Sequence, residues 1–217
     1  MRPLGMGIFE RTLMYELYTW FDGEDLYRAL PRMNPEEQFE AGKKTGELLR
    51  KLHALPPMYD AEPWGIRFGR KVRDIIQSYD DKPDKSQSVD LLIQYLQDNQ
   101  KLLDNRPHSF THGDFDTSNI MLTPDGQIGI IDIGGGNNCN DPWWDFFWAV
   151  NGGDAHFNTG LIKGYFEGEP PIEYFRLLSY YIVLGTLEWC SENAKTVLNW
   201  FDDMRNPVPI WYLSHIE

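Results

Sequence analysis

The sequence predicts an α+β fold that is mainly α-helical. Three observations predict it: alternating side chains near the start, long amphipathic segments between residues 34 and 103, and a short apolar hairpin pattern at residues 119–132. The expected order is one strand, three helices, a β-hairpin and then an aromatic-rich, mostly helical region at residues 143–204. No internal repeat or long linker divides the chain into two large domains.

The segment RTLMYELYTW, residues 11–20, predicts the first strand. In a strand, every second side chain of this segment would lie on the same face, and the turn residues of FDGED follow directly. Residues 1–10 leave room for at most one short partner strand. Because open strand edges tend to pair with another chain, we expect a homodimer formed through residues 1–20.

The first long helix is predicted at residues 34–55. Asn34 is a favourable N-cap, Pro35 suits the first helical position, and two glutamates follow in the first turn. Two further helices are predicted at residues 70–79 and 89–103. A β-hairpin then follows at residues 119–132, with Asp-Gly at its turn.

A polar loop, FTHGDFDTSN, precedes this hairpin, and loops on a rigid scaffold commonly carry catalytic groups. It contains Asp114 and, five residues later, Asn119, while Asp132 ends the second hairpin strand. A base Asp, an Asn five residues on and a further Asp form the catalytic half of the kinase template. One amide and one carboxylate suit Mg²⁺ that is shared with substrate phosphates, which leaves Asp114 to accept a hydroxyl proton. The alternative is that the three residues are turn and cap residues of the hairpin.

The segments HGDFDTSN, IIDI and NDPWWDF together resemble the aminoglycoside phosphotransferase and choline kinase superfamily, which has a protein-kinase-like fold. YELYTWFDGEDL is similar to its hinge strand, and WFDDMRNPVPIWYL to the tail of a bacterial subgroup. The resemblance covers nearly the whole chain and implies a C-terminal lobe with a catalytic β-hairpin and an N-terminal hinge strand. Ile133, where Phe is usual, and Asn140, which replaces a Gly, depart from the pattern.

The resemblance implies transfer of the γ-phosphoryl of ATP or GTP to a hydroxyl of a small acceptor, such as an aminoglycoside or a choline-like compound. It makes Asp114 the catalytic base and Asn119 and Asp132 the magnesium ligands. The nucleotide is expected to meet the presumed hinge, which consists of Thr19, Trp20, Phe21 and Asp22.

The resemblance also implies three supporting residues. His112 is expected to order the catalytic loop, Asp141 to brace it and Asp145 to anchor the helix that follows. Without the resemblance, His112 is a hydrogen-bonded structural histidine, and both carboxylates cap a helix that starts at Pro142.

The composition excludes some partners. A formal net charge of −13 argues against nucleic acid and anionic membranes, and it attracts cationic small molecules, although solubility alone also explains it. No apolar run approaches the roughly eighteen residues of a membrane span, and the N-terminus lacks a signal-peptide core, so we expect a cytoplasmic protein. The two cysteines show no metal-ligand spacing.

The sequence also lacks a Gly-rich phosphate loop and a strand lysine. Only about a dozen residues precede the hinge strand, whereas a complete small lobe takes roughly 80 to 100 residues. We therefore expect residues 1–23 to be a remnant of the N-terminal lobe with the hinge strand, and residues 24–217 to form a helical C-terminal lobe. The alternative function is a weak or inactive truncated family member that acts as a binding remnant or needs a separate N-terminal lobe.

Overall fold

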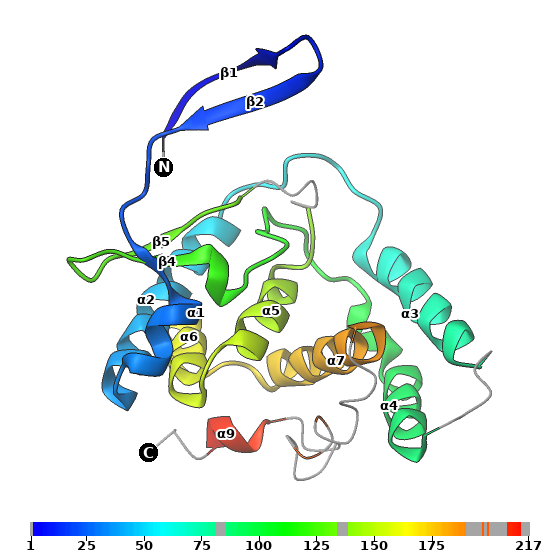
Figure 1. Cartoon of the computed structure of the whole chain (residues 1–217). Helices are drawn as coiled ribbons and strands as arrows, with labels where there is room; N and C mark the ends of the chain where they lie inside the picture. Colours follow the sequence, from blue (N-terminus) through cyan, green and yellow to red (C-terminus); the bar gives the residue numbers. More distant parts are fainter. Residues whose placement is uncertain are drawn as a thin grey trace.

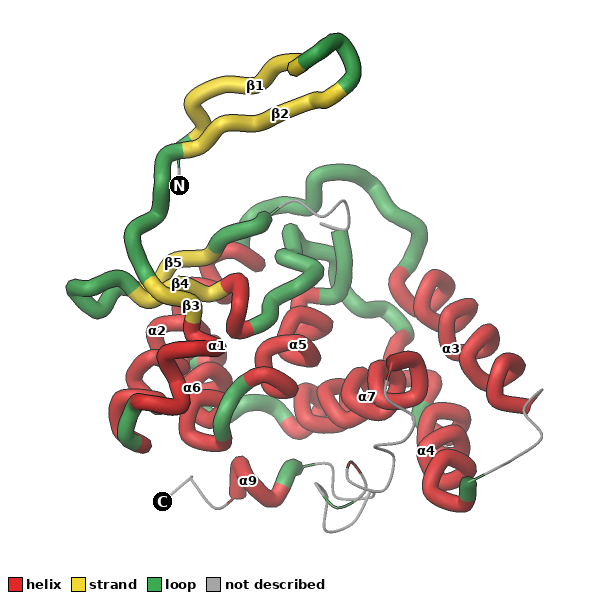
Figure 2. The backbone as a smooth tube through the Cα atoms, in the orientation of Figure 1, coloured by secondary structure: helices red, strands yellow, loops and turns green. Residues whose placement is uncertain are grey.

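The computed structural model describes residues 2–80, 86–133, 139–189, 197, 199 and 208–213. A helical body carries a small sheet on one side, and a two-stranded hairpin projects away from this body (Figure 1). Both sheets are antiparallel, and helices dominate the body (Figure 2). The predicted mainly α-helical α+β fold is confirmed.

The projecting hairpin consists of β1 (Pro3–Phe9) and β2 (Leu13–Tyr18). Its turn residues Glu10 and Arg11 have φ values of 49° and 67°, a left-handed backbone that matches the twist of paired strands. The sequence predicted one strand with at most a short partner, whereas β1 has seven residues. Two glycines in PLGMGIF weaken the sequence signal for this strand, because glycine is depleted in strands.

The second sheet has the order β3-β4-β5 and consists of β3 (Glu24–Asp25), β4 (Ile120–Leu122) and β5 (Ile128–Ile130). The predicted hairpin is therefore present, with Ile120 opposite Ile130. The sequence did not predict β3. This strand lies just after the projecting hairpin in sequence and pairs with β4, the strand that follows the polar loop.

Helix α2 (Pro35–His53) begins as predicted at Asn34. The Asn34 side chain accepts from the Glu37 N–H, and the Glu37 carboxylate accepts from the Asn34 N–H, both at 2.9 Å. A short helix, α1 (Leu26–Ala29), and a 3-10 turn at Leu30–Arg32 precede it. Helix α2 packs closely on α6 (Ala155–Phe166).

The remaining helices are α3 (Trp64–Asp80), α4 (Gln87–Asp98), α5 (Asp145–Gly152), α7 (Ile172–Trp189) and α9 (Ile210–Leu213), with 3-10 turns at Gln100–Leu103, Thr117–Asn119 and Pro142–Trp144. Helix α3 begins before the predicted residue 70, because buried Trp64 stacks on Phe68 with ring centroids 3.8 Å apart. The predicted helix 89–103 ends at Asp98 and continues as a 3-10 turn. Most of the tail beyond residue 189 lies outside the described residues. Within the described chain, no helix combines the length and apolarity needed to cross a bilayer.

Candidate active site

The polar loop, residues 110–119, is tied to the end of strand β5 by His112. The ring donates from Nε2 to the carbonyl oxygen of Ile131 at 2.9 Å, and its Nδ1 accepts from the Asp114 N–H at 3.3 Å. This pattern requires a neutral ring with its proton on Nε2. His112 therefore links the backbone at Asp114 to the residue directly before Asp132.

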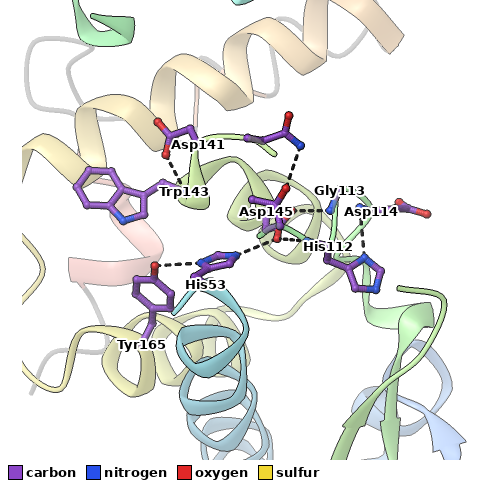
Figure 3. Close-up of polar contacts among 10 residues, drawn as sticks. His53, His112, Gly113, Asp114, Asp141, Trp143, Asp145 and Tyr165 are labelled. Atoms are coloured by element: carbon purple, nitrogen blue, oxygen red, sulfur yellow. Dashed lines mark hydrogen bonds and ion pairs between the residues drawn. The ribbon is translucent and has the colours of Figure 1, made fainter. Parts of the chain in front are cut away.

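The buried carboxylate of Asp145 accepts hydrogen bonds from the backbone of this loop. It accepts from the N–H groups of His112 at 2.8 Å and Gly113 at 2.9 Å, and from Nε2 of His53 at 3.0 Å (Figure 3). Gly113 has a φ of 85°, in the left-handed region that favours glycine. The turn that presents Asp114 is therefore fixed by two backbone bonds to one carboxylate.

The His53 ring lies between Asp145 and Tyr165, with its Nδ1 3.0 Å from the Tyr165 hydroxyl (Figure 3). Burial, followed by the nearby carboxylates of Asp141 and Asp145, raises the pKa of Tyr165. The hydroxyl therefore stays protonated and donates to His53, whose Nε2–H then donates to Asp145. Sequence reasoning missed His53 and Tyr165, because no motif spacing connects either residue to the loop.

Asp141 has a different set of partners. Its carboxylate accepts from the Trp143 N–H at 2.8 Å, from the Tyr181 hydroxyl at 2.8 Å and from the Arg106 guanidinium at two positions. Burial opposes the charge of Arg106, but the hydrogen bonds and the charge of Asp141 outweigh it and raise the Arg106 pKa. We expected Asp141 to brace the loop and Asp145 to anchor the next helix. Asp145 is the first residue of α5 and also holds the loop, while Asp141 caps the turn at Pro142–Trp144.

Asp114 and Asn119 are in direct contact. The Asn119 side-chain N–H₂ donates to the Asp114 carbonyl oxygen at 2.9 Å and to one Asp114 carboxylate oxygen at 3.2 Å. The Asn119 backbone carbonyl also accepts from the Ile131 N–H at 3.0 Å, which places Asn119 beside the residue directly before Asp132, just past the end of β5 at Ile130. Since its amide nitrogen faces Asp114, the amide oxygen of Asn119 remains for another partner.

Asp132 is exposed and has a φ of 59°. Among the described residues, its carboxylate forms no hydrogen bond or ion pair. No group of three or more His, Cys, Asp or Glu side chains forms a metal site in the described chain. An amide oxygen and a carboxylate are nevertheless hard ligands that fit Mg²⁺ when substrate phosphates complete its coordination.

The presumed hinge residues are only partly near this site. Thr19 pairs with Arg2 through the backbone, and Trp20 is 87% exposed. Phe21 lies over Gly129 of β5, where an added Cβ would come within 2.2 Å of the Phe21 ring. The structure therefore brings Phe21 to the β4–β5 hairpin, while Trp20 and Asp22 are exposed to solvent.

Comparisons with known proteins identify the family of this chain. A model of the phosphotransferase enzyme family matches residues 7–175. The search of curated proteins gives no match.

Several solved structures are similar. A choline/ethanolamine kinase family protein from Mesorhizobium loti gives a TM-score of 0.62 at 19% identity, over 98% of this chain and 72% of that chain. A GDP complex of aminoglycoside 2'-phosphotransferase-IIIa gives 0.68 at 13% identity, over 98% and 71%. Plasmodium vivax ethanolamine kinase gives 0.54 at 14% identity, over 97% and 67%. At these identities the likeness shows the fold. Because the family model covers more than half of the sequence, the chain belongs to the phosphotransferase enzyme family.

Proposed function

We propose that the chain is a small-molecule kinase that transfers the γ-phosphoryl of ATP or GTP to a hydroxyl of a small acceptor. The carrying observation is the contact of Asp114 with Asn119 on a loop that His112 and Asp145 hold beside Asp132. The nucleotide-bound state of similar structures, one with GDP and one with ADP, supports a nucleotide donor.

In this proposal Asp114 is the general base. One carboxylate oxygen accepts from Asn119, which fixes the side chain and leaves the other oxygen to accept the hydroxyl proton of the acceptor. The deprotonated oxygen then attacks the γ-phosphorus, and the nucleoside diphosphate leaves. Asn119 and Asp132 would hold Mg²⁺, which supplies neutralising charge to the β- and γ-phosphates when bound.

The acceptor and the nucleotide position form a finer part of the proposal. A net charge of −13 favours an acceptor with a cationic group, such as an aminoglycoside or a choline-like compound. The contact of Phe21 with Gly129 supports a nucleotide position near residues 19–22, close to the hairpin that delivers Asp132. We also propose that residues 1–23 form a unit with the hinge and residues 24–217 form the catalytic lobe.

One observation favours a second candidate, a binding protein with weak or no transferase activity that can require a separate N-terminal lobe. Residues 1–23 contain no lysine that could serve as the strand lysine of the kinase template. Cations that clamp the phosphates usually supply much of the rate enhancement in phosphoryl transfer.

Calorimetric titration with Mg·ATP and Mg·GTP tests the proposed function. We expect binding of at least one nucleotide that weakens when Mg²⁺ is chelated or when Asp132 is replaced by Asn. The matched control is Asp125→Asn, because Asp125 is also an exposed carboxylate of the hairpin but lies at its turn. Absence of binding to either nucleotide at millimolar concentrations would exclude a kinase function for this chain.

A further inference from the structure

A second candidate site lies between helices α3, α4 and α7, where a cavity has a volume of about 690 Å³. This volume is in the usual range for small-molecule sites. The apolar part of its lining consists of Ile75, Val89, Ile93 and Leu187. The residues that we assign to phosphoryl transfer are not among the described residues that line it.

The charged part of the lining consists of three cations from α3 and two carboxylates, Asp74 and Glu188. Arg67, Arg70 and Lys71 share one helix face, because they are spaced three and four residues apart. Lys71 forms an ion pair with Glu188 at 2.7 Å, and Arg70 pairs with Glu62. Two of the three cations are therefore neutralised by carboxylates of this chain.

Arg67 differs from these two cations. It donates to the carbonyl oxygen of Cys139 and to the side-chain oxygen of Asn140, and its guanidinium lies over the Trp64 ring at 5.1 Å. All three partners are neutral, and within the described residues Arg67 forms no ion pair with a carboxylate. A half-buried cation without a counter-ion is unusual in a chain with a net charge of −13.

Unsatisfied polar atoms lie in the same region. Nε of Arg67 is buried without a hydrogen-bond partner, and Nε2 of His108 is as well. Burial, followed by the charge of Arg67, lowers the pKa of His108, which indicates that the two side chains are electrostatic neighbours. Groups of this kind are rare in native structures. Both atoms are buried beside the guanidinium and His108 does not line the cavity, so the ligand-facing donors of Arg67 are its terminal N–H groups.

We propose that this cavity binds an amphipathic small molecule with a carboxylate or phosphate group, in which Arg67 holds the anionic group and Ile75, Val89 and Ile93 contact the apolar part. A planar guanidinium suits both kinds of anion. The ligand class is opposite in charge to the proposed acceptor, and none of Asp114, Asn119 and Asp132 lines this cavity, so we treat it as a separate site.

Calorimetry with four probes that share one octyl-length chain tests the proposal: octanoate, octyl phosphate, octanol and octyltrimethylammonium. We expect one molecule of octanoate or octyl phosphate to bind per chain, at least about tenfold more tightly than the other two probes, because only an anion gains a charge-assisted bond. The stronger of the two anions identifies the head group.

Two variants locate the binding. Arg67→Gln should remove the preference for anions, whereas Arg73→Gln, an exposed arginine of the same helix, should retain it. Since Arg67 also holds residues 139 and 140, Val89→Trp provides a second variant that fills the apolar end and leaves Arg67 intact; it should abolish binding of the anions. Equal binding of all four probes, or anion binding unchanged in either Arg67→Gln or Val89→Trp, would overturn the proposal. No phosphoryl transfer is measured, so the result does not depend on the proposed function.

Discussion

His53 and Asp145, 92 residues apart in sequence, are joined by a buried hydrogen bond of 3.0 Å. The same carboxylate holds the N–H groups of His112 and Gly113. Helix α2, which ends at His53, is therefore mechanically connected to the loop that presents Asp114. The position of the proposed base therefore depends on His53, a buried residue outside the loop.

Replacing His53 by Ala should destabilise the protein by about 1–3 kcal/mol, because a buried carboxylate loses one of its donors and a cavity forms. The midpoint of urea unfolding measures the change. Tyr165→Phe is the matched comparison, since it removes the hydroxyl that bonds to Nδ1 but keeps the bond between His53 and Asp145, and it should cost roughly 1 kcal/mol. Wild-type stability of the His53 variant would contradict a structural role for this bond.

Arg106→Met should be more damaging, at about 3–5 kcal/mol, because it leaves the fully buried carboxylate of Asp141 without its cation. Arg28→Met removes the exposed ion pair with Asp25 and should change stability by no more than about 1 kcal/mol. Chemical denaturation of both variants checks the difference. Similar losses of unfolding free energy in the two variants would contradict the larger contribution expected of the buried Arg106–Asp141 pair.

His108 predicts a pH dependence of stability. Burial first, and then the charge of Arg67, lowers its pKa in the folded state below the value of about 6.5 in an unfolded chain. As the pH falls from about 6.5 towards the folded-state pKa, the unfolded chain binds a proton that the folded chain does not, so stability falls. His108→Gln should reduce this loss, as measured by thermal unfolding between pH 7 and pH 5, about the range in which histidine titrates. An unchanged pH profile in the variant would assign the dependence to other groups.

The projecting hairpin supports the expected homodimer, which remains a proposal. Apolar side chains are exposed on both faces of a two-stranded sheet, including Met14 at 79% on one face and Leu13 at 59% on the other, and a sheet of this size is rarely stable alone. Sedimentation equilibrium should give about twice the 25.3 kDa of one chain. Met6→Glu should shift the protein towards monomer, while Leu91→Glu, an exposed leucine on α4, should not. A wild-type protein that sediments as a monomer at high concentration would contradict the proposed dimer.

Local chemistry made part of this fold predictable. Helix α2 follows from the cap at Asn34, and the β4–β5 hairpin follows from Asp125-Gly126, because each signal acts within a few residues. The proposed base and its Asn neighbour were also predictable, since Asp114 and Asn119 lie in one loop.

The support beneath the site was not predictable in the same way. Asp145 meets His53, and Asp141 meets Arg106, across 92 and 35 residues, so only tertiary packing determines which carboxylate receives which donor. Strand β1 was missed for a different reason, because glycines weaken its local signal.

The most direct test of the central claim is a phosphoryl-transfer assay with Mg·ATP and Mg·GTP against a panel of aminoglycosides and choline-like alcohols. The assay compares the wild type with Asp114→Asn, and Asp125→Asn serves as the control. We predict transfer by the wild type and the control, and a loss of about a hundredfold or more for Asp114→Asn with nucleotide affinity retained. Equal transfer rates for Asp114→Asn and the wild type would contradict the assignment of Asp114 as the base, and absence of transfer by the wild type to every acceptor would favour the binding function.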